Sequence, residues 1–240
     1  MLQVYNCLTT EHDLRLVALA GTVCLLASIV AISLFQSARA AAAGQTRFVW
    51  LTLDAAAVGF GIWATHFIAM LAYDPGAGMG YDLGLTVVSL VIAILITGAG
   101  LGLALLDSRY ATTAIGGAIV GLGVAAMHYT GMMALNLPGR ISWSPGLVIA
   151  SIIVGSTLGT LSLLLASRRD RPGDTFIAGL LLTLAIVGMH FTGMGAVTFT
   201  PDPTISADLL GSSPVKLSLV IAAAAAVILV GCLIAALFDR

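Results

Sequence analysis

Charged residues are scarce in this chain. They make up 9% of its 240 residues, whereas hydrophobic residues make up 59% and the mean hydropathy is +1.07. A water-soluble fold of this length needs a polar surface that this composition cannot supply. Nothing marks a domain boundary, so residues 1–240 are interpreted as one integral membrane domain. The net charge of −1 argues against nucleic acid as a partner and against a polybasic anchor.

Cysteine is also rare, which limits the chemistry that the chain can carry. The three cysteines are Cys7, Cys24 and Cys232, and none is part of a CxxC pair of the kind that marks zinc sites or redox-active dithiols. No Asp, Glu or Ser recurs beside the repeated histidines described below, so a general base or nucleophile is lacking. We therefore predict that the chain is not an enzyme, although a copper centre could in principle carry out oxygen chemistry.

Long apolar runs are abundant instead, each close to the ~20 residues that a spanning helix needs. They predict an all-α, polytopic membrane protein whose partner is the lipid bilayer. The seven predicted transmembrane helices cover roughly Leu14 to Phe35, Phe48 to Tyr73, Leu83 to Leu106, Thr112 to Leu137, Pro145 to Ala166, Thr175 to Phe199 and Val215 to Phe238. The first 13 residues lack a basic start and contain Glu11 and Asp13, so a cleaved signal peptide is not expected.

The loops differ in their basic residues, and this difference predicts the orientation. Loops after the odd-numbered runs, together with the C-terminal end, carry Arg39, Arg47, Arg109, Arg168, Arg169, Arg171 and Arg240. The other side carries Arg140 and Lys216, with Arg15 at the outer edge of the first run. Because basic loops stay in the cytosol, we predict that the N-terminus lies outside and the C-terminus lies in the cytosol.

Three histidines recur at a fixed interval: His66, His128 and His190 are each 62 residues apart. Each is followed four residues later by a methionine, namely Met70, Met132 and Met194. A period of 62 residues contains two spanning helices, so every copy returns to the same depth and the same face. The sequence thus predicts three two-helix repeats plus a final helix, with the histidines near the outer ends of helices two, four and six.

Residues four apart share one face of a helix, so each repeat offers an imidazole and a thioether together. This donor set suits a soft, redox-capable ion, and copper, especially Cu(I), fits it best. Zinc sites seldom use thioethers, and one haem takes two axial ligands, which leaves a threefold pattern unexplained. Met127 and Met189 point roughly 100° away from the histidines that follow them and are weaker candidates. The small residues Ala69, Gly131 and Gly193 would allow close helix contact.

Two other interpretations stay open at this point. An intramembrane histidine can simply bond to a neighbouring helix, with methionines filling gaps in the core. Three polar copies at one depth favour a shared metal site, because polar groups are costly in hydrocarbon. A copper or metal-ion transporter is the alternative function, and Asp54, about two turns inside the second span on the cytosolic side, is the residue that would support it. No acid is repeated at the corresponding Gly116 and Ala178.

The string Met127-His128-Tyr129-Thr130 resembles the signature of the MHYT family of bacterial integral membrane sensor domains, and the other two copies are variants of it. The resemblance implies a multi-pass protein of the bacterial inner membrane. It also implies that copper senses a diatomic gas (O2, CO or NO) or the redox state and signals to a cytosolic output domain or partner. Family members are often joined to cyclase, phosphodiesterase, kinase or DNA-binding modules. By position, the implied metal-binding residues are His66, Met70, Met127, His128, Met132, Met189, His190 and Met194.

Overall fold

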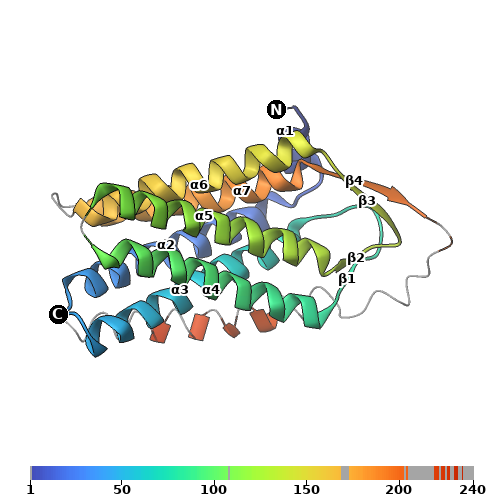
Figure 1. The fold of residues 1–240 in the computed structure, drawn as a ribbon. Coiled ribbons are helices and arrows are strands. Elements are labelled where there is room, and N and C mark those ends of the chain that lie inside the picture. Colours follow the sequence, from blue (N-terminus) through green and yellow to red (C-terminus); the bar gives the residue numbers. More distant parts are fainter. Residues whose placement is uncertain are drawn as a thin grey trace.

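The computed structural model describes residues 2–107, 109–168, 173–202 and 204, together with isolated residues between 219 and 234. Its helices form a bundle with short strands at one end (Figure 1). The helices are α1 (Leu2–Thr10), α2 (Leu14–Ala40), α3 (Gln45–Ala72), α4 (Leu83–Leu106), α5 (Tyr110–Met133), α6 (Pro145–Arg168) and α7 (Asp174–Met194). The strands are β1 (Gly80–Tyr81), β2 (Leu135–Asn136), β3 (Gly139–Trp143) and β4 (Val197–Pro201).

Within the described residues, six helices, α2 to α7, are long and apolar enough to cross a membrane. The helical, multi-pass character predicted from the sequence is therefore confirmed. The seventh predicted span, Val215 to Phe238, falls mostly outside the described residues, although Leu219, Val220 and Ile221 are helical. The orientation of the termini stays a prediction.

The strands close one end of the bundle. β1 pairs with β2 and β3 pairs with β4, both antiparallel. These strands explain why α5 and α7 end before the apolar runs that predicted them, Thr112 to Leu137 and Thr175 to Phe199. Leu135 and Phe199 belong to strands and pack against the core. Hydropathy alone does not distinguish such a short strand from the end of a helix.

The six long helices form a closed ring in chain order, with α7 returning to contact α2. The second helix of each repeat, α3, α5 and α7, is more buried than the first, α2, α4 and α6. The first helices direct large apolar side chains outward, as at Leu26, Leu95 and Ile153. Such a surface suits lipid, and the buried α3, α5 and α7 are the helices that carry the repeated histidines.

Glycines allow the helices to pack closely. Gly117 and Gly121 of α5 face Gly155 and Gly159 of α6 so closely that a Cβ at Gly121 would overlap the Gly155 carbonyl oxygen. The same contact recurs between repeats, because Gly59 lies on Ile94 just as Gly121, 62 residues later, lies on Ser156. Small residues at helix contacts suit lipid, where dispersion contacts replace the hydrophobic effect. The 62-residue repeat in the sequence therefore corresponds to a repeated contact between helices.

Candidate metal centre

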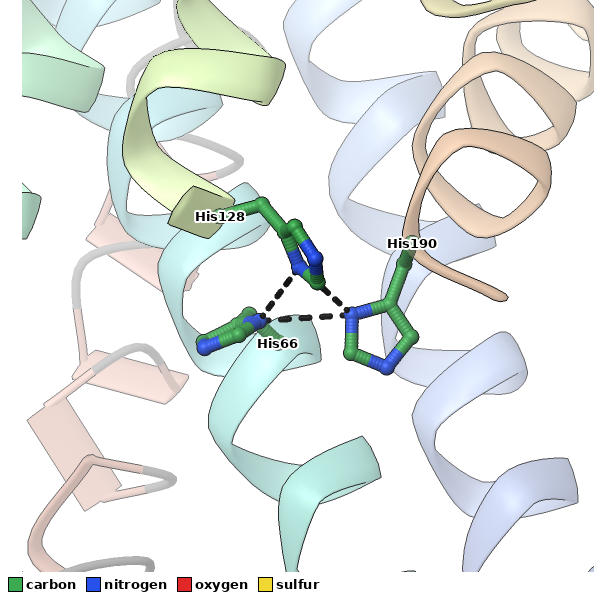
Figure 2. Close-up of side chains that lie close together, drawn as sticks. All are labelled: His66, His128 and His190. Atoms are coloured by element: carbon green, nitrogen blue, oxygen red, sulfur yellow. Dashed lines mark hydrogen bonds between the residues drawn. The ribbon is translucent and has the colours of Figure 1, made fainter. Parts of the chain in front are cut away.

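The three histidines converge on one point inside the bundle. His66 of α3, His128 of α5 and His190 of α7 lie within the last two turns of their helices and are 2%, 0% and 4% exposed. Figure 2 shows their rings meeting through one nitrogen each. The Nδ1 atoms form a triangle with sides of 3.3, 3.3 and 3.2 Å. We call these three residues the histidine triangle.

Hydrogen bonds alone do not satisfy this arrangement. A neutral imidazole carries one proton, so each Nδ1 is either a donor or an acceptor. Whichever protons are assigned, at least one side of the triangle joins two donors or two acceptors. A cation at the centre would accept all three lone pairs at once, and the centre of a triangle of this size is about 1.9 Å from each nitrogen, close to the ~2.0 Å of metal–imidazole bonds. The donor set therefore fits a metal ion.

Glycines closely cover the outer side of two of the rings. The Nε2 atoms of all three histidines are buried and have no hydrogen-bond partner among the described residues. A Cβ at Gly131 would come within 2.6 Å of the His66 Nε2, and a Cβ at Gly193 within 2.7 Å of the His128 Nε2. The predicted role of these glycines in close approach is confirmed. Each glycine packs against the imidazole of the preceding repeat.

An aromatic ring follows each histidine, a feature to which the sequence analysis gave no role. Phe67, Tyr129 and Phe191 stand edge to face against their histidines, at centroid distances of 4.8, 4.9 and 5.0 Å. Each then meets a second ring near the strand end: Phe67 meets Tyr81, Tyr129 meets Trp143, and Phe191 meets His12. Tyr81 and Trp143 are themselves 62 residues apart, so the repeat contained the signal for this aromatic layer.

The methionines of the motifs are buried in the same region but differ in where they face. Met70, Met132 and Met194 are 0%, 2% and 1% exposed. Met194 also lines a cavity at the strand end. Met189 packs against Gly155 of α6, in agreement with its predicted turn away from the histidines. Coordination by any methionine, including Met127, stays a prediction. Thr130 donates to the Ala126 carbonyl, so its hydroxyl serves the helix backbone.

His12 and Asp54 are also ionisable residues buried inside the fold. His12, 6% exposed, lies between α1 and α2, where backbone hydrogen bonds from Asp13 to Ala72 and from Asp74 to Glu11 attach its segment to the end of α3. Burial lowers the pKa of His12, which favours the neutral ring. Asp54 is 0% exposed, and neither of its oxygens has a partner among the described residues. The depth of Asp54 in the membrane stays a prediction, and no bond to a neighbour is seen among the described residues.

Six apolar spans surrounding a buried cluster of imidazoles define a multi-pass membrane protein with a candidate metal centre in its core. The chain belongs to the MHYT family, whose model is described as a bacterial signalling protein N-terminal repeat and matches residues 59–117, 121–179 and 184–238. The resemblance noted in the sequence is thereby confirmed. No solved structure shows significant similarity to the chain.

Several curated proteins are similar to this chain. An uncharacterized signaling protein of Caulobacter vibrioides is 40% identical over 85% of the chain and 25% of its own length. The bifunctional diguanylate cyclase/cyclic di-GMP phosphodiesterase MucR of Pseudomonas aeruginosa is 36% identical over 80% of the chain and 29% of its length. The cyclic di-GMP phosphodiesterase NbdA of the same organism is 35% identical over 81% of the chain and 25% of its length. The chain thus spans about a quarter of these relatives.

Proposed function

We propose that this chain is a membrane-embedded sensor domain that holds a copper ion in the histidine triangle and signals a diatomic gas or the redox state to the cytosol. The observation that carries the proposal is the triangle itself. Three Nδ1 atoms lie 3.2–3.3 Å apart, an arrangement that one cation satisfies and protons do not. In this arrangement the proton of each ring would stay on Nε2, and all three Nδ1 lone pairs would be available as ligands.

The surroundings of the triangle favour Cu(I) over a divalent ion. Among the described residues, only the three histidines form a cluster of His, Cys, Asp or Glu close enough to hold one ion, so no carboxylate offsets a second charge. Burying charge without compensation is costly, and a monovalent ion costs less than a divalent one. The buried thioethers of Met70, Met132 and Met194 add soft donors on the same helices. Three-coordinate Cu(I) would supply an open position of the kind that a diatomic gas occupies.

The fold suggests how the chain's own residues transmit a change. The triangle joins α3, α5 and α7, and Gly117 and Gly121 hold α5 closely against α6. A change in how tightly the three rings are held would alter the packing of all three repeats, and two packed arrangements of a bundle are sufficient for a switch. By the arginine distribution, the triangle lies near the outer face and the opposite end of the bundle is cytosolic. The signal would pass from the outer end of the bundle to its cytosolic end.

The relatives support a signalling role, because two of them are named for cyclic di-GMP synthesis or hydrolysis. They extend well beyond the portion that matches this chain. We therefore propose that the bundle regulates a cytosolic output domain or partner of that kind, in the inner membrane of a bacterium.

Copper analysis of the purified protein tests the proposal. Anaerobic loading with Cu(I) should give one ion per chain, and His128→Ala combined with His190→Ala should abolish it. Met132→Leu should weaken binding if the thioether takes part, whereas the neighbouring exposed Met133 provides a matched control, because Met133→Leu should bind copper as the unchanged chain does. After oxidation, electron paramagnetic resonance should show coupling to imidazole nitrogen. Undiminished copper in the double variant would rule out the site.

One observation favours a second candidate, a metal-ion transporter. Asp54 is a wholly buried carboxyl group without a partner among the described residues, and such groups often mark ion pathways in membrane proteins. Copper flux into proteoliposomes separates the two functions. A transporter would show flux that Asp54→Asn abolishes, whereas a sensor would bind copper stoichiometrically without flux.

A further inference from the structure

The histidine triangle is not covered equally on its three sides. Between α3 and α5, Gly131 packs against His66, and between α5 and α7, Gly193 packs against His128. The corresponding residue at the third junction is Ala69, which carries a Cβ and packs with Ala20 and Val23 of α2. The helix contacts agree, because α5 contacts both α3 and α7 more closely than α3 contacts α7. The α3–α7 junction is therefore the exceptional one.

His12 occupies the equivalent of an aromatic position at this junction. Tyr81 covers Phe67 and Trp143 covers Tyr129, both with rings that do not bind metal ions. In the third repeat the covering ring is His12, which lies 5.3 Å from Phe191 and 5.3 Å from Tyr73, centroid to centroid. Phe191 in turn contacts His190, at a centroid distance of 5.0 Å. A potential metal ligand thus lies one ring away from the third histidine, whereas the corresponding rings beside the first two, Tyr81 and Trp143, are not imidazoles.

The hydrogen bonds of His12 identify which of its nitrogens is available. Its Nδ1 lies 2.8 Å from the Cys7 carbonyl oxygen, which only accepts, so Nδ1 carries the proton and donates. In the neutral ring Nε2 then holds the lone pair. That atom has no hydrogen-bond partner among the described residues, and water does not reach it readily, because His12 is only 6% exposed. A buried acceptor without a partner is costly, and it needs a reason to be retained.

A cavity lies at this corner of the bundle, at the strand end. We call it the outer pocket; its volume is about 390 Å³, and its lining includes Cys7, Glu11, Tyr73, Asp74, Met194 and Thr198. Glu11 and Asp74 are carboxylates that attract cations, and Met194 is a thioether from the third His–Met pair. Cys7 and Tyr73, which line the pocket, also contact His12. The contacts therefore run from the pocket wall to His12, and from His12 through Phe191 to His190 of the triangle.

We propose that the α3–α7 junction is the entrance through which Cu(I) reaches the histidine triangle, with the Nε2 atom of His12 as the transfer ligand. This inference rests on the proposed function. The step is an exchange of ligands without a change of oxidation state: the Met194 thioether and the His12 imidazole hold the ion in turn and release it to the three Nδ1 atoms. All these donors are neutral, so no proton has to leave. His12 affects how fast the triangle fills, and it is not one of the ligands at equilibrium.

Loading kinetics test this assignment. Cu(I) is supplied on a weak chromophoric chelator, and its transfer to the purified protein is followed by the loss of the chelator's absorbance. His12→Leu should slow transfer about tenfold, through the higher barrier left by a missing ligand, while the final copper content stays the same. Asn6→Ala removes a side chain from the same pocket that is not a strong copper ligand, and it should load at the unchanged rate.

A second variant keeps the test decisive if His12→Leu does not fold. Thr198 is exposed, lines the outer pocket, and contributes only backbone atoms to the β3–β4 pair, so Thr198→Trp should block the pocket and slow loading without touching either histidine site. Unchanged rates in both variants would overturn the entrance, as would a loss of equilibrium copper in His12→Leu with unchanged thermal stability. Failure of the unaltered protein to bind copper would instead refute the proposed function.

Discussion

Gly131 lies directly against His66: a Cβ on residue 131 would come within 2.6 Å of the imidazole Nε2 atom. Gly131→Ala must therefore move the ring or push α5 away from α3, and either movement distorts the triangle of Nδ1 atoms. If copper binds there, its affinity should fall by about 10–100-fold, the usual effect of disturbing a group that orients a metal ligand. Competition with a chelator of known affinity measures the change.

A glycine elsewhere in the bundle controls for the substitution itself. Gly21 of α2 has open space where a Cβ would stand, so Gly21→Ala should bind copper unchanged. Equal affinities in the two variants would mean that the His66 ring tolerates displacement and that the fit of Gly131 has no bearing on binding.

The position of the triangle followed from the sequence, whereas the direction of its rings did not. The 62-residue interval placed His66, His128 and His190 at one depth on alternate helices, because two spans per repeat return the chain to the same face. Which ring nitrogen faces inward depends on side-chain rotamers and on the glycines opposite, and no periodicity records these. The same limit applied to His12, which approaches the triangle from a segment outside the repeat.

The helix ends were predicted less well, for a related reason. Apolar runs continue from α5 and α7 into strands β2 and β4, since residues such as Leu135 and Phe199 cover the end of the bundle. A turn ends each helix near its histidine motif, with the amide of Ala134 donating to the Gly131 carbonyl and that of Ala196 donating to the Gly193 carbonyl. Hydropathy follows burial, and the apolar residues Leu135 and Phe199 of the two strands are buried or partly buried, so hydropathy predicted continuous spans.

Packing between repeats should be as sensitive to an added methyl group as the metal centre is. A Cβ on Gly121 would overlap the backbone of Gly155, which cannot rotate away, so Gly121→Ala should separate α5 from α6. The expected loss is about 1–3 kcal/mol in the free energy of unfolding, the usual cost of overpacking. Unfolding in mixed detergent measures it. Gly146 of α6, where a Cβ meets nothing within 4 Å, is the matched control, and equal stability of the two alanine variants would contradict close glycine packing.

Cys7 should behave as an unreactive thiol at neutral pH. Burial, together with the Glu11 carboxylate, raises its pKa from 9.0 to about 12, and only the thiolate reacts with alkylating agents. Its alkylation rate, followed by mass spectrometry of the peptide, should keep rising with pH beyond 9. The neutral thiol is the form that folding favours, so its stabilising contribution is complete below pH 9 and is lost as the pH rises toward 12.

An exposed thiol on the same helix provides the comparison for Cys7. Thr9 is exposed, so Thr9→Cys in a Cys7→Ser background should react as an ordinary thiol and level off near pH 9. If Cys7 levelled off at the same pH, its thiol would be solvated and the wall of the outer pocket would be open at that point.

Substitution of Asp54 tests whether the half of the bundle away from the histidine triangle has a function of its own. Its carboxyl group is fully buried and has no partner in the part of the chain that the structure describes, so removing it should relieve a desolvation cost. Asp54→Leu, which is similar in size, should raise the free energy of unfolding by about 1–3 kcal/mol. Copper content should not change, since Asp54 and His66 are about three turns apart on α3. A buried carboxyl group that lowers the stability of the fold would be consistent with a functional role for Asp54. Destabilisation by Asp54→Leu would instead show that the carboxyl group is hydrogen-bonded in the membrane. Asp54 would then no longer support an ion pathway.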